Sequence, residues 1–141
     1  NYINGVSLFK PMANQELEPG QVVARAIIEV VGKPPEHASE ALKLVLDRIK
    51  ENTKLTIRST HVEPPVEKEK MYSTFADIEF MVKQFEDLVW FCFDYLPSSV
   101  EIIEPQKIAY SSQRFTNFLN ELQARMHSYD LALKALSKEK K

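Results

Sequence analysis

Glycine is scarce in this chain, with only Gly5, Gly20 and Gly32 among its 141 residues. Loops that cradle phosphate need glycines close together, because only glycine lets the backbone come near the anion. The motifs Gly-x-Ser-x-Gly, His-Glu-x-x-His and Cys-x-x-Cys are missing as well. These absences exclude the common local signatures of nucleotide binding, hydrolysis, zinc catalysis and thiol redox chemistry. We therefore expect no catalytic residues, no cofactor and no metal.

Cysteine and long apolar runs are almost missing too. The single cysteine, Cys92, cannot form a disulfide within the chain, and it lies in the apolar run 88–93. We predict that its thiol is buried and unreactive, which suits a reducing compartment. No apolar stretch approaches the ~20 residues that cross a bilayer, and the N-terminus lacks the order of a signal peptide. A soluble, cytoplasmic protein is therefore expected.

An excess of one charge is also lacking, since 18 basic residues stand against 20 acidic ones and the formal net charge is -2. Nothing in this balance attracts the chain to nucleic acid or to an anionic membrane, so we expect neither as a partner. Apolar residues make up 44% of the chain, which is enough for one continuous core at this length.

The N-terminal residues are set apart from the rest. The chain begins with Asn1 and carries an internal Met12, which we interpret as the natural start, so that residues 1–11 are a foreign or added extension. We divide the chain into an extension at 1–20, a domain at 21–105, and a C-terminal helix with a charged tail at 106–141.

Within the domain, segments whose apolar residues recur at every second position alternate with segments whose apolar residues recur about every 3.6 residues. The pattern predicts a strand at 21–31, a helix from 35 to about 51, strands at 55–62 and 71–82, a helix at 84–95 and a strand at 100–104. Residues 63–70 hold two prolines and no apolar period, so a loop is expected there. The order β-α-β-β-α-β predicts an α+β fold, in which both helices cover one face of a four-stranded antiparallel sheet.

This element order resembles the ferredoxin-like superfold and, within it, the ACT-type regulatory domains. The resemblance covers residues 21–104 and implies pairing into dimers and binding of an amino acid or another small effector. ACT-type domains commonly have an Asp-x-Pro-Gly-x-Leu turn after the first strand, whereas residues 31–38 here place Gly32 before the prolines and contain no aspartate. The run 96–105 is also similar to one in small archaeal proteins of unassigned function.

Few residues qualify as ligand-binding candidates. His37 stands with Glu36 and Glu40 in the first helical turn, where acidic residues are favoured without any metal. The hydroxyls of Ser98 and Ser99 can meet an anion, although a turn after Pro97 explains them better. The candidate ligand-binding residues are Gly32, Lys33, His37, Ser98 and Ser99.

The sheet face away from the helices bears mostly polar residues, namely Arg25, Glu29, Ser73, Phe75, Asp77 and Glu79. RNA-binding sheets expose several aromatics among basic residues, whereas this row has one aromatic and several carboxylates that repel phosphate. Cross-strand charge pairing is the better interpretation. The aromatic run Phe85, Trp90, Phe91, Phe93 and Tyr95 suits core packing better than a ligand pocket.

A helix at about 111–136 carries an apolar stripe formed by Phe115, Phe118, Leu119, Leu122, Met126 and Tyr129. The open sheet face offers Val23, Ile27, Val31 and Phe75, so we expect the stripe to dock there, within the chain or across a homodimer. The sequence thus favours a non-enzymatic binding, regulatory or assembly module, and we expect it to form a homo-oligomer, a dimer, and to bind a protein partner or a small-molecule effector. An ACT-like effector sensor and a small enzyme with a site across a dimer interface are the alternatives.

Overall fold

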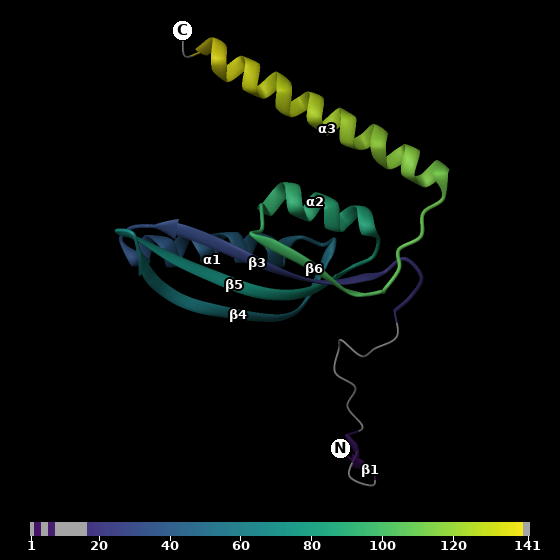
Figure 1. Ribbon diagram of the computed structural model, residues 1–141, viewed down its shortest axis with the longest axis horizontal. Coiled ribbons are helices and arrows are strands. Elements are labelled where there is room, and N and C mark those ends of the chain that lie inside the picture. Colours follow the sequence, from purple (N-terminus) through teal and green to yellow (C-terminus); the bar gives the residue numbers. More distant parts are fainter. Residues whose placement is uncertain (1, 4–5, 8–16, 140–141) are drawn as a thin grey trace. The chain divides into compact units, whose positions relative to one another are not determined.

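A four-stranded antiparallel sheet is the main element of the computed structural model, which describes residues 2–3, 6–7 and 17–139 (Figure 1). The strands lie in the order β4-β5-β3-β6 and comprise β3 (Val22–Gly32), β4 (Leu55–Lys68), β5 (Met71–Val82) and β6 (Ser99–Glu104). Helix α1 (Pro35–Glu51) joins β3 to β4, and α2 (Phe85–Tyr95) joins β5 to β6. The predicted βαββαβ order and ferredoxin-like topology are confirmed.

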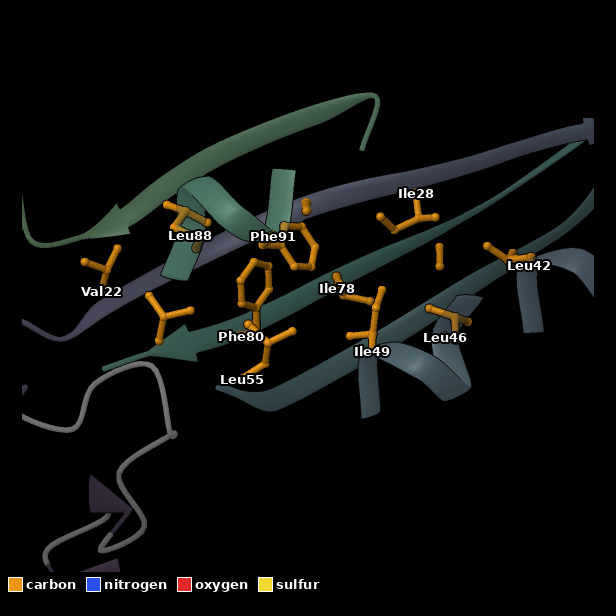
Figure 2. Close-up of a cluster of buried hydrophobic side chains, with 14 residues drawn as sticks. Val22, Ile28, Leu42, Leu46, Ile49, Leu55, Ile78, Phe80, Leu88 and Phe91 are labelled. Carbon is orange, nitrogen blue, oxygen red and sulfur yellow. The ribbon is translucent and has the colours of Figure 1, made fainter. Parts of the chain in front are cut away.

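The core lies between the sheet and the two helices. Leu42, Leu46 and Ile49 of α1 and Leu88 and Phe91 of α2 meet the alternate, inward-facing residues of the strands in one cluster (Figure 2). At its centre the rings of Phe80 and Phe91 lie 4.5 Å apart. Both helices therefore cover the same face of the sheet, as the crossover rule predicts.

Local signals explain where the helices begin and end. Pro35 opens α1, where its missing N–H costs no hydrogen bond, and Asn52 closes it by donating its backbone N–H to the carbonyl of Ile49. The Asn52 side chain also donates to the hydroxyl of Tyr95, 3.0 Å away, and so ties the ends of α1 and α2 together. Helix α2 ends at Leu96, which takes a left-handed conformation before Pro97.

The predicted loop at 63–70 is wrong, because β4 continues to Lys68 and forms a hairpin with β5. Pro64 and Pro65 fall within a register shift of this edge strand, where a missing backbone donor costs little. The hydroxyl of Thr74 on β5 donates to the carbonyl of Glu63 at 2.6 Å and holds the irregular segment in place. Pairing with a distant strand overrides the local turn signal here.

The remaining described residues form separate elements. Strand β1 (Tyr2–Ile3) pairs with β2 (Val6–Ser7), and α3 (Ser112–Glu139) belongs to a second unit, residues 108–141. The interpretation of Met12 concerns a position outside the described residues. The backbone N–H of Arg114 donates to the Ser111 hydroxyl at 3.1 Å, and the Tyr110 ring lies 5.8 Å from that of Phe115. Helix α3 thus starts with a serine cap and a hydrophobic staple.

The turn of the β4–β5 hairpin is strained. Glu69 and Lys70 have φ of 52° and 69°, the left-handed conformation of a two-residue turn that asparagine and glycine adopt at less cost. We predict that Glu69→Asn with Lys70→Gly raises the free energy of unfolding by about 1 kcal/mol, measured by urea denaturation. Lys68→Gly, in the adjacent extended strand, is the control and is expected to destabilise. Equal effects of the two changes would contradict the strained turn.

Candidate functional site

The sheet face away from the helices is organised by a cross-strand ion pair. The Nε of Arg25 on β3 donates to Oδ1 of Asp77 on β5 at 2.7 Å, and its Nη2 donates to Oδ2. The pair is bidentate, the geometry that suits guanidinium and carboxylate best. These hydrogen bonds lower the pKa of Asp77 and raise that of Arg25. The predicted cross-strand charge pairing is confirmed.

Further carboxylates surround this pair. Glu79 and Glu101 act on Arg25 through their charge, and the hydroxyl of Ser73 donates to Oε2 of Glu29 at 2.7 Å. His61 on the edge strand lies opposite Asp77 and within 2.7 Å of Glu63. A surface with so many carboxylates and one arginine repels a phosphate backbone.

The four apolar residues expected on this face, Val23, Ile27, Val31 and Phe75, are not exposed together. Val23 is fully buried, Ile27 and Phe75 are half-buried, and only Val31, at the end of β3, is exposed. Pairing explains the difference, because the register sets Ile27 beside Asp77 and Phe75 beside Glu29. The apolar residues are therefore interrupted across the strands by charged ones, which a strand-by-strand reading does not reveal.

A groove of about 290 Å³ runs between α1 and the edge strand β4. Its floor is apolar, and its rim carries Lys43, Asp47 and Lys50 from successive turns of α1. The floor is formed by Leu42, Leu46, Val62, Pro64 and Pro65. Such a groove suits a small molecule with an apolar body and a charged group. The sequence did not predict it, because its β4 side falls in the segment taken for a loop.

A second groove, of about 360 Å³, lies between α2 and β6 and is almost wholly apolar. Val100 and Ile102 point to the core side of β6, opposite Ala26 and Ala24, yet they are 37% and 40% exposed. Cys92 lines the same groove and packs against the core cluster, but it is only partly buried, so the predicted burial of its thiol is met in part. Helix α2 is too short to cover the edge of the sheet at β6.

The structure divides the sequence-predicted candidates between two places. Gly32, Lys33 and His37 lie at the turn from β3 into α1, and the last two are exposed. Ser99 pairs with Ile27, which at ~3.3 Å per residue is about 16 Å along β3 from Gly32. The backbone N–H and hydroxyl of Ser98 both donate to the carbonyl of Ile27, at 2.8 and 3.2 Å. Ser98 therefore closes a turn, and the five residues do not form one site.

Within residues 17–139 and the two short N-terminal strands, no group of three or more His, Cys, Asp or Glu residues could hold a metal ion. In that part of the chain, no helix is both long and apolar enough to span a membrane.

The aromatic run of α2 is split between core and surface. Phe91 is buried, and Phe85 and Tyr95 pack against the core cluster, so core packing is the right interpretation for these three. Trp90 and Phe93 are half-buried, with ring centroids 5.8 Å apart.

Comparison with known proteins gives one match, to the model of the MJ0538 family, over residues 23–139. The chain belongs to the MJ0538 family. Neither the curated proteins nor the solved structures yield a match. The matched residues run from β3 to the last residue of α3, so the C-terminal helix is part of what defines the MJ0538 family. ACT-like effector binding stays a prediction, because this match does not bear on it.

In this MJ0538 family member, α3 displays an apolar stripe along one side. Its exposed members include Phe115, Leu119, Met126 and Tyr129, each between 40% and 49% exposed, whereas Phe118 and Leu122 are half-buried. Leu133 and Leu136 continue the same stripe and are more exposed still. This is the largest set of exposed apolar side chains on one element of the described chain.

We predict that the Arg25–Asp77 pair makes the stability of the folded protein depend on pH. The pKa of Asp77 lies below its ordinary 3.8 in the folded protein, so its contribution to stability is present above pH 3.8 and is lost as the pH falls through the folded value. Asp77→Asn should therefore lower the unfolding midpoint at pH 6, and this deficit should shrink in strong acid. Glu101→Gln, which removes a charge not hydrogen-bonded to Arg25, should show a smaller deficit at pH 6. Equal deficits of both variants at every pH would contradict a special role for the pair.

We predict that the thiol of Cys92 reacts slowly with thiol reagents, although the residue is partly exposed. Burial raises the pKa of the thiol, which lowers the fraction of reactive thiolate. We expect a thiol reagent at pH 7.5 to label Cys92 several-fold more slowly in the native protein than in urea. A cysteine placed at exposed Ser137 should label at the same rate in both. Equal native rates at the two positions would refute the prediction.

Proposed function

We propose that this chain is a non-enzymatic assembly module, which forms a homodimer through the apolar stripe of α3. The observation that carries the proposal is the exposure of that stripe, from Phe115 to Leu136, on a helix of 28 residues. Burying one large apolar side chain contributes about 1.5–3 kcal/mol of favourable free energy. An association that buries the whole stripe is therefore strongly favoured by the hydrophobic effect. Contiguous exposed apolar residues of this kind are found at interaction surfaces more often than elsewhere on a protein.

Electrostatics favour another helix over the open sheet face as the partner of this stripe. Covering the sheet face would take Arg25, Glu29 and Glu79 out of water, and buried charges that are imperfectly paired cost several kcal/mol each, in order of magnitude. The stripe itself is apolar and needs an apolar counterpart. A second copy of α3 supplies one, and closed two-fold pairs are the commonest soluble assemblies.

Binding of a small effector is a second candidate function, and the α1–β4 groove favours it. An apolar floor with Lys43 and Lys50 at the rim suits a small apolar carboxylate, and the ferredoxin-like topology is shared with ACT-type sensors. Native mass spectrometry of freshly purified protein tests this candidate. A retained small molecule, released by changing Lys43 and Lys50 to Ala, would support it, and a bare chain under saturating amino acids would count against it.

The assembly role predicts opposite results for two matched changes on α3. Met126 lies in the stripe and is 49% exposed, whereas Leu131 lies off it and is 67% exposed. Met126→Glu should shift the full chain from dimer toward monomer in sedimentation velocity, since it places a charge in the interface. Leu131→Glu should leave the dimer intact, because glutamate is as good a helix former as leucine. A wild-type protein that is monomeric at all concentrations, or an unchanged dimer in Met126→Glu, would overturn the proposed function.

A further inference from the structure

We propose that two copies of α3 form a parallel, in-register coiled coil. This inference rests on the assembly role proposed above and specifies its geometry. The spacing of the stripe is the first observation. Apart from Phe118, its members alternate in steps of four and three over three heptads, at Phe115, Leu119, Leu122, Met126, Tyr129, Leu133 and Leu136.

This spacing distinguishes a coiled coil from an ordinary surface helix. A helix that packs on a globular core shows a broad apolar face with a period of 3.6 residues, whereas a seam confined to alternate steps of four and three has a period of 3.5. A straight helix drifts by about 20° per heptad relative to that seam, so two helices must wind around each other to keep it in contact. The stripe of α3 therefore fits a second helix with the same period.

The heptad assigns every residue of α3 a position. With Leu119, Met126 and Leu133 at the first core position, called a, the second core position, d, holds Phe115, Leu122, Tyr129 and Leu136. None of these core residues is charged. Two large apolar residues lie off the seam: Phe118 falls at position g, beside the core positions, and Leu131 falls on the outside of the pair.

The charged residues beside the core positions favour a parallel over an antiparallel arrangement of the two helices. Arg125 falls at position g, and Asp130, five residues later, falls at position e of the next heptad. In a parallel pair, g of one helix faces this e of the other, so Arg125 of each copy meets Asp130 of its partner and the two-fold axis makes the contact twice. An antiparallel pair sets g against g and e against e, which brings like charges together.

The contact that Asp130 makes within its own helix is compatible with this pairing. Asp130 already accepts from Lys134 on its own helix, at 2.9 Å, and its second carboxylate oxygen can accept from an arginine of another copy. The following g and e positions hold Ala132 and Ser137, which are small and neutral and so oppose neither direction. The Arg125–Asp130 contact is therefore the element that favours the parallel arrangement.

Parallel order brings the N-terminal ends of both helices to the same end of the coiled coil. These ends carry the Ser111 cap and the contact between Tyr110 and Phe115. The staple orders the first core layer before the partner arrives, which reduces the entropy lost on association.

Disulfide formation at single positions tests the direction in the full chain. In a Cys92→Ser background, Leu119→Cys and Leu133→Cys each place one thiol at a core position, near opposite ends of the seam. A parallel, in-register pair brings each thiol next to its own copy, so both variants should cross-link quantitatively under mild oxidation. Leu131→Cys, on the outside, is the control and should stay monomeric on a denaturing gel.

The outcomes separate this inference from the assembly role. If sedimentation still shows a dimer but neither Leu119→Cys nor Leu133→Cys cross-links, the helices are not parallel and in register, and the coiled-coil proposal fails while the assembly role stands. If the wild-type chain is monomeric, both fail. Cross-linking of Leu131→Cys at the same rate as the core variants would mean random collision and would also overturn the inference.

A mixing experiment tests the charge pair. Arg125→Glu and Asp130→Lys each place like charges across their own homodimer, whereas a mixed dimer restores opposite charges at both contacts. Native mass spectrometry of an equimolar mixture should show the mixed dimer well above the statistical half at low salt. A statistical distribution would contradict the g-to-e contact.

Discussion

The pairing of β3 with β5 is the constraint on which the rest of this structure depends. Their residues alternate so strictly that one face holds Ala26, Ile28, Ile78 and Phe80, while the other holds Arg25, Asp77 and Glu79. A slip of one residue would bury the charges and expose the core, so the register is strongly specified. Helices α1 and α2 can pack on only one of these faces, and the topology follows.

The same alternation determines what the remaining surfaces can bind. The outer face satisfies its charges within the sheet, through the Arg25–Asp77 pair and the contact between Ser73 and Glu29. Its charged side chains would be costly to cover with a long apolar helix, and its carboxylates oppose a phosphate backbone. The apolar surface that remains lies in the grooves beside α1 and α2 and along α3.

Periodicity predicted the parts of the fold that depend on local sequence. The bounds of α1 and β5 and the order of elements followed from apolar spacing, and the charge pairing followed from the residues of one face. The course of β4 beyond Val62 could not be predicted, because Pro64 and Pro65 are turn signals locally and are tolerated only because β5 pairs with the segment. The α1–β4 groove was missed for the same reason.

The apolar stripe of α3 shows a different limit of sequence reading. With Phe118 included, its spacing looks like that of an ordinary amphipathic helix facing a core. The heptad becomes clear once Leu133 and Leu136 extend the stripe and the seam is counted in steps of four and three. The polar character of the open sheet face could be predicted from the sequence, whereas the partner that each charge meets depends on strand register and needed the structure.

The central claim is that α3 is stabilised by a second copy of itself. Amide hydrogen exchange of the full chain at several protein concentrations measures this directly, because only association makes protection depend on concentration. The account predicts that amides from Leu119 to Leu133 become more protected as concentration rises, while those of β3 stay unchanged at their high protection. Protection in α3 that is strong and independent of concentration would contradict the account, since it would mean that the helix packs within its own chain.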